Sequence, residues 1–165
     1  QEGGFGISAA MAGLIVTIKL WLRPVGGIGG GLLGDRFGKT GILLLSFLVA
    51  AASLVAMIAL PGIGSTVLFV GLVLLVGLIT YTIRGLYWAI LDDCQVPANI
   101  TGLAIGIISL VGYAPDTYLP LVNGYLSDRY PGIAGYQFYF GYIAAICVLG
   151  AIATLALMAR LKKKG

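Results

Sequence analysis

The chain has no histidine and only two cysteines among its 165 residues. Without an imidazole no Ser-His-Asp triad can form, and Cys94 and Cys147 are too few for a metal cluster or a disulfide framework. We therefore expect no metal ion, no cofactor and no enzyme activity. Each cysteine is interpreted as a small apolar filler.

Charged residues are also scarce, because they make up 10% of the sequence while hydrophobic residues make up 59%. A soluble domain carries about a quarter charged residues, so this composition indicates an integral membrane protein that lies in a lipid bilayer. The formal net charge is +4, but no basic patch is interleaved with aromatic residues. Nucleic acid is therefore not an expected partner.

A helix needs about 20 mostly apolar residues to cross a bilayer. Five stretches meet this requirement, namely Phe5 to Gly34, Thr40 to Leu60, Ser65 to Leu91, Ile100 to Ser127, and Gly135 to Leu161. Residues 42–60 and 65–79 are apolar on every face, which excludes the alternating strands of a membrane barrel. The sequence predicts an all-α membrane protein in which residues 1–165 form one transmembrane domain of about five helices.

Basic residues near the helix ends predict the orientation in the membrane. Six of them would share one side, namely Arg36, Lys39, Arg160, Lys162, Lys163 and Lys164. Arg129 stands alone in the connectors of the other side. Because positive residues accumulate in cytoplasmic loops, we expect a cytoplasmic C-terminus in a multi-pass protein of the cell (inner or plasma) membrane.

Residues 26–41 look at first like a phosphate-binding loop. Residues 29–34 satisfy G-x-G-x-x-G, and residues 38–40 supply the end of a Walker motif. However, the glycines close an apolar span instead of following a strand, and Leu33 stands where the Walker spacing requires glycine. Nucleotide binding is therefore excluded in favour of close helix packing.

The packing interpretation rests on glycines spaced four residues apart, a pattern that lets two helix backbones approach each other. The pairs are Gly26 with Gly30, Gly27 with Gly31, and Gly30 with Gly34.

The end of this stretch carries a second pattern. Gly31-Leu32-Leu33-Gly34-Asp35-Arg36-Phe37-Gly38-Lys39 resembles the cytoplasmic loop motif of the major facilitator superfamily, written G-x-L-a-D-r-x-G-r-k, although Thr40 departs from it. The resemblance implies that charge contacts at this loop hold one conformation closed. The implied gating residues are Gly31, Gly34, Asp35, Arg36, Gly38 and Lys39. The alternative is a polar loop that only caps two spans.

Residues 124–129 echo residues 31–36, and three span ends separate the two copies. The copies would therefore lie on opposite sides of the membrane, as in the inverted three-helix repeats of secondary transporters. The resemblance then implies helices eight to twelve of a twelve-helix protein. Its N-terminal half would be the missing partner.

Four charged residues stand inside the predicted spans, namely Lys19, Arg23, Arg84 and Asp116. A charge at mid-membrane costs about 2.5 to 3.5 kcal/mol on insertion scales, so each needs a reason to be there. The helical spacing places two further groups on polar faces. These are Tyr81 and Trp88 beside Arg84, and Ser109, Tyr113, Pro120 and Asn123 beside Asp116.

Three positive charges against one negative charge favour a small anionic solute, which would supply the missing negative charge. The predicted substrate-binding residues are Arg84, Lys19, Arg23, Tyr81, Trp88, Tyr113 and Asn123. Asp116 is the candidate for carrying a proton in symport. The alternatives are an Arg84–Asp116 structural ion pair, and Lys19 and Arg23 reaching a membrane surface.

The sequence thus predicts a secondary active transporter that moves a small organic anion by alternating access. Residues 84–116 also resemble the organic-anion and sugar-phosphate branches of the superfamily. The alternatives are a non-transporting structural or assembly subunit, a half-transporter that needs a partner chain, or an anion channel lined by Lys19 and Arg23.

Overall fold

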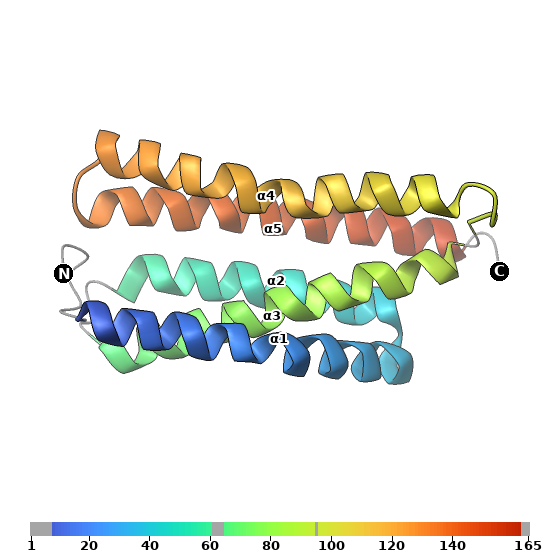
Figure 1. Cartoon of the computed structure of the whole chain (residues 1–165), viewed down its shortest axis with the longest axis horizontal. Helices are drawn as coiled ribbons and strands as arrows, with labels where there is room; N and C mark the ends of the chain where they lie inside the picture. Colours follow the sequence, from blue (N-terminus) through green and yellow to red (C-terminus); the bar gives the residue numbers. More distant parts are fainter. Residues whose placement is uncertain (1–7, 61–64, 95, 163–165) are drawn as a thin grey trace.

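The chain folds into five long helices, as a computed structural model that describes residues 8–60, 65–94 and 96–162 shows (Figure 1). The helices are α1 (Ala9–Phe37), α2 (Lys39–Ala59), α3 (Thr66–Asp93), α4 (Thr101–Arg129) and α5 (Ile133–Lys162). All five are long and apolar enough to cross a membrane. The described residues contain no strand, and the predicted all-α membrane fold is confirmed.

Helices α1 and α4 are longer than the bilayer core requires. At a rise of about 1.5 Å per residue, the 29 residues of α1 span about 44 Å, whereas the hydrocarbon core is about 30 Å thick. The same length holds for α4. The ends of these helices therefore extend to the polar surfaces of the membrane, while their central residues lie at hydrocarbon depth.

The first connector is much shorter than the predicted loop of residues 35–39. Helix α1 continues to Phe37, and α2 begins at Lys39, so Gly38 alone reverses the chain. Its φ of 93° lies in the region that favours glycine, and its N–H donates to the carbonyl of Gly34 at 2.9 Å. Helix α3 likewise runs through Asp93 and α4 through Arg129, beyond the predicted span ends.

The two ends of the bundle carry different helix termini (Figure 1). The end of α1, the start of α2, the end of α3, the start of α4 and the end of α5 lie together at what we call the Gly38 end. The turn between α4 and α5 contains Gly132, at a φ of 78°, and lies at the opposite, Gly132 end. Residues 31–36 and 124–129 thus occupy opposite ends of the bundle.

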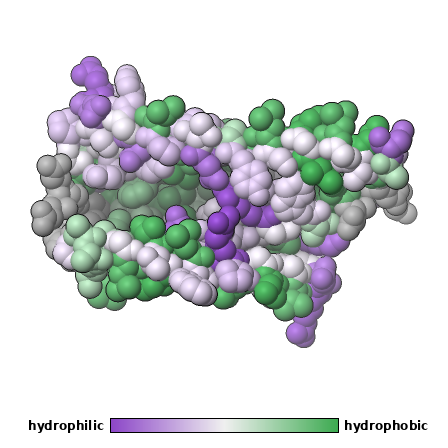
Figure 2. All heavy atoms as spheres, viewed as in Figure 1, coloured by the Kyte–Doolittle hydropathy of each residue, from purple (hydrophilic) through white to green (hydrophobic). Residues whose placement is uncertain are grey.

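Helix α2 is the centre of the packing, because it contacts α1, α3 and α5. One apolar cluster joins Leu54 and Met57 of α2 to Ala144 of α5, and a second joins Leu43 of α2 to Leu86 of α3. Helix α4 packs along α5 and contains no buried residue. Seen from the side of Figure 2, a hollow separates α4 from α1 and α3, and a band of hydrophilic residues crosses it.

Helices α1 and α3 approach each other at the glycine face of α1. A Cβ atom added to Gly26 would lie 2.8 Å from the carbonyl oxygen of Leu78, and one added to Gly30 would lie 2.8 Å from Cγ2 of Thr82. The Thr82 hydroxyl also donates to the carbonyl of Gly26 at 3.2 Å. These contacts confirm the Gly26–Gly30 packing pair.

The other glycines of the stretch behave differently. Gly34 is buried, and a Cβ there would lie 2.7 Å from Cδ2 of Leu86. In contrast, a Cβ added to Gly27 or Gly31 would meet no atom within 4 Å. The Gly27 backbone nevertheless takes part in the close approach, because a Cβ added to Gly85 of α3 would lie 3.2 Å from the carbonyl oxygen of Gly27, whereas Gly31 shows no such contact.

We expect Gly26→Ala to destabilise the fold, because its methyl group would press against the α3 backbone. Forcing a methyl group into a packed contact costs about 1 to 3 kcal/mol. Gly29→Ala is the matched control: a Cβ there meets no atom within 4 Å, and alanine is the better helix former by about 1 kcal/mol. Thermal unfolding in detergent should show a lower Tm for Gly26→Ala and an equal or higher Tm for Gly29→Ala. Equal Tm values for the two variants would contradict the close contact.

Candidate functional site

The charged residues of the predicted spans occupy the central parts of their helices. Lys19 and Arg23 lie in the middle third of α1, Arg84 lies at the end of the middle third of α3, and Asp116 lies in the middle third of α4. At these heights the surroundings are lipid hydrocarbon unless the side chains border water or protein. The hydrophilic band across the hollow in Figure 2 lies at a comparable height.

Arg84 and Asp116 form an ion pair between α3 and α4. Nη2 of Arg84 lies 2.6 Å from Oδ1 and 2.7 Å from Oδ2 of Asp116. The Arg84 guanidinium also lies over the ring of Tyr113, 5.1 Å from its centroid. The structure therefore unites three residues that helical spacing had placed on two separate polar faces.

The ion pair is not enclosed by the protein. Of the side-chain surface, 21% is exposed for Arg84 and 56% for Asp116. The carboxylate is thus the more accessible partner. A pair at this depth is stable only if its exposed side borders water or other polar groups, because lipid offers neither hydrogen bonds nor charge screening.

Arg23 and Lys19 of α1 lie against α3. The Arg23 guanidinium stands over the Tyr81 ring at 5.4 Å from its centroid. The methylene carbons of Lys19 pack so closely on Gly77 that a Cβ there would lie 2.8 Å from Cγ of Lys19. In the described part of the chain, no carboxylate lies within ion-pair distance of Lys19 or Arg23.

Tyr87 belongs to this region and was missed by the sequence analysis. Its ring contacts that of Trp88 in a tilted arrangement, with centroids 5.0 Å apart, and its hydroxyl approaches Gly112 of α4. The spacing rule that aligned Tyr81 with Arg84 also aligns Tyr87, which lies one turn beyond Arg84. The signal was therefore present in the sequence.

Two polar atoms of the region are buried without a hydrogen-bond partner among the described residues, the hydroxyl of Tyr87 and Oδ1 of Asn123. A buried polar group without a partner costs about 1 to 3 kcal/mol, so such groups are usually satisfied by water or by a ligand. Asn123 was predicted as a site residue from its place on the polar face of α4.

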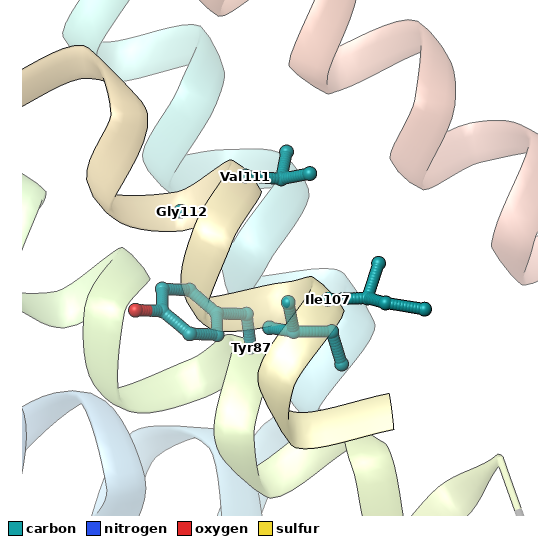
Figure 3. A pocket seen from close by; sticks show the side chains of 5 residues that line it. Tyr87, Ile107, Val111 and Gly112 are labelled. Carbon is teal, nitrogen blue, oxygen red and sulfur yellow. The ribbon is translucent and has the colours of Figure 1, made fainter. Parts of the chain in front are cut away.

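A shallow cavity of about 350 Å³ lies beside Tyr87 (Figure 3). It is lined by Tyr87, Ile107, Ile108, Val111 and Gly112. In Figure 3 the Tyr87 ring lies against the α4 backbone near Gly112, while Ile107 and Val111 point to the other side of α4. Among the described residues, no group of three or more His, Cys, Asp or Glu side chains could hold a metal ion.

The loop motif residues lie at the Gly38 end, far from the central charges. Asp35 and Arg36 are exposed in the last turn of α1. Nζ of Lys39 lies 3.0 Å from Oδ1 of Asp93 and donates to the carbonyl of Ala89 at 3.1 Å. The resemblance implied that the partners of this loop lie in a missing half of the protein, whereas Lys39 contacts α3 of the same chain.

Comparison with known proteins supports a membrane protein. Over 147 residues the chain is 31% identical to Inner membrane protein YihN of Escherichia coli (strain K12), which covers 87% of this chain and 35% of that protein. Over 73 residues it is 36% identical to Inner membrane protein YqcE of the same organism, covering 44% of this chain and 17% of that protein. The chain thus spans about a third or less of the length of these relatives. No family model and no solved structure matches.

These comparisons overturn the resemblance to the major facilitator superfamily. No model of that family matches the chain, and the similar proteins are named only as inner membrane proteins. The placement as helices eight to twelve and the narrower organic-anion branch fall with it. The gating role of the motif also loses its support. Similarity and structure together support an all-α membrane protein, whose described residues contain five helices long and apolar enough to cross a bilayer.

Proposed function

We propose that the chain forms part of an inner membrane transporter that moves a small organic anion by alternating access. The observation that supports this most strongly is the positive charge of Lys19 and Arg23, halfway along α1, which has no carboxylate within ion-pair distance among the described residues. The name of the relatives supports the location, because YihN and YqcE are both inner membrane proteins.

The charge balance at mid-membrane favours an anion. Asp116 neutralises Arg84 through a direct ion pair, so the net surplus comes from the two cations of α1. Each unpaired cation costs about 2.5 to 3.5 kcal/mol at this depth. An anionic solute that enters the hollow would remove this cost, whereas a cationic solute would add to it. The site therefore favours carboxylate, phosphate or sulfonate groups.

The aromatic residues restrict the two guanidinium groups. Tyr81 lies under Arg23 and Tyr113 lies under Arg84, which limits the rotation of both side chains and orients their N–H donors. Trp88 and Asn123 would border the solute, one on each side of the ion pair along the helices. Asp116 is the candidate for proton coupling. A proton taken up from the hollow by its carboxylate would remove the negative charge beside Arg84.

A second candidate function is favoured by the exposure of α4. This helix contains no buried residue, and its apolar side chains Leu103, Leu110 and Leu121 are all more than half exposed. Five helices with such a surface suit a structural or assembly subunit, or a half-transporter, that is covered by a partner chain. A structural or assembly subunit predicts no anion uptake by any protein that contains the chain, whereas a half-transporter predicts uptake only together with its partner chain.

We expect the Gly38 end, with the C-terminus, to lie in the cytoplasm, because Arg36, Lys39, Arg160 and Lys162 gather there against Arg129 at the other end. Green fluorescent protein fused after Gly165 should fluoresce, and alkaline phosphatase inserted after Pro131 should be active. If phosphatase were active when fused at the C-terminus and inactive when inserted after Pro131, the orientation would be the opposite one.

The transport proposal is tested with the protein expressed from its complete reading frame and reconstituted in proteoliposomes. We expect uptake of at least one of labelled benzoate, inorganic phosphate and methanesulfonate. Arg23→Gln should lower the initial rate on the order of tenfold or more, because hydrogen bonds to charged groups contribute about 1.5 to 3 kcal/mol. Arg160→Gln, an exposed arginine at the end of α5, is the matched control and should leave the rate unchanged. Equal uptake by wild type and Arg23→Gln would remove Arg23 from the site.

A further inference from the structure

We propose that Asp116 occupies the anion subsite on Arg84 and that the transported anion displaces it, which releases α4 from α3. This inference rests on the proposed function and adds the step by which binding changes the conformation. It assigns Asp116 the role of an internal competitor for the solute.

The geometry of the ion pair makes Asp116 replaceable. A single nitrogen of Arg84, Nη2, contacts both carboxylate oxygens, at 2.6 and 2.7 Å. The strongest arginine–carboxylate pairs instead use two parallel N–H···O bonds from two nitrogens of the fork. A free anion can rotate into that arrangement, whereas Asp116 is held by the backbone of α4. The solute therefore has a stronger geometry available than the resident carboxylate.

The exposure of the two partners gives the solute a way in. Asp116 is the more exposed side chain, at 56% against 21% for Arg84. An anion that arrives through the hollow can thus approach the guanidinium from the side on which the carboxylate now lies. The released carboxylate would stay in contact with the same polar space and would not have to enter lipid.

The packing of α4 explains why this exchange would move a helix. Helix α4 packs along α5, and its backbone makes few close approaches to α3. The contacts between α3 and α4 are made by side chains, with Arg84 on Asp116 and on the Tyr113 ring, and with Tyr87 near Gly112. The ion pair is the charged member of this set. Its loss would leave α4 attached mainly to α5.

The binding test uses Asp116→Asn, which keeps the side-chain shape and removes the competing charge. Binding of benzoate, inorganic phosphate and methanesulfonate to the purified full-length protein is measured by ligand-induced thermal shift. For the anion that wild type binds, we expect the apparent Kd to fall on the order of fivefold, the size of a part-exposed ion pair. Asp128→Asn, which removes an exposed carboxylate at the end of the same helix, should leave the Kd unchanged.

The movement of α4 is tested with spin labels at Val67→Cys on α3 and Tyr125→Cys on α4, both highly exposed, in a Cys94→Ser, Cys147→Ser background. We expect the distance between the labels to increase when the anion is added to wild type. In Asp116→Asn the increase should appear without the anion, and in Asp128→Asn it should still require the anion.

The outcomes separate this inference from the proposed function. Anion uptake by wild type, together with an unchanged Kd and an unchanged label distance in Asp116→Asn, would overturn the exchange and leave the transport proposal standing. A weaker affinity in Asp116→Asn would also overturn it, because the carboxylate would then assist binding. Absence of both binding and uptake in wild type would overturn the proposed function and the exchange together.

Discussion

The contact between the backbones of α1 and α3 is the constraint on which the arrangement of the site depends. Gly26 and Gly30 let the two helices approach until an added Cβ would collide with Leu78 or Thr82. This approach brings Lys19 against Gly77 and Arg23 over Tyr81. Two cations are thereby fixed on a neighbouring helix at the depth where the membrane tolerates them least.

The charge distribution follows from this placement. A charged side chain at hydrocarbon depth needs a counter-charge, an aromatic face or water. The charged residues of the spans differ in which of these the structure provides. Arg84 has both Asp116 and Tyr113, whereas Arg23 has the Tyr81 ring and, in the part of the chain that the structure describes, no carboxylate partner. The hollow beside α4 is the space in which water or a solute can supply what is missing. Helix α4 packs sparsely, as we expect of a helix whose position depends on whether water or a solute occupies the hollow.

Much of the fold was predictable because the bilayer sets strict rules. Length and hydropathy predicted five spans, since only helices satisfy their own backbone groups in lipid. Helical spacing also aligned Arg84 with Tyr81 and Tyr113 with Asp116. The pairing between these faces, and the Lys39–Asp93 ion pair, were not predictable, because they depend on which helices become neighbours and at what heights.

The structure gives a physical reason why the motif suggested the wrong family. A one-residue turn between two long helices needs glycine at Gly38, where φ is positive, and charged residues at both helix ends, where the membrane surface begins. Gly34 is small because Leu86 packs against it. Several letters of the motif therefore have local structural causes, so the match of this short segment to the motif was weak evidence of ancestry.

The central claim is that the mid-membrane cations border water and attract negative charge. Its most direct test introduces Thr80→Cys, an exposed position one turn before Arg84, into the chain without its native cysteines. The reaction rates of this thiol with an anionic and a cationic methanethiosulfonate reagent are compared with those at Leu149→Cys on the outer face of α5. The account predicts that the thiol at residue 80 reacts, and faster with the anionic reagent, while the thiol at residue 149 does not. A thiol at residue 80 that is as unreactive as the one at 149, or that prefers the cationic reagent, would contradict it.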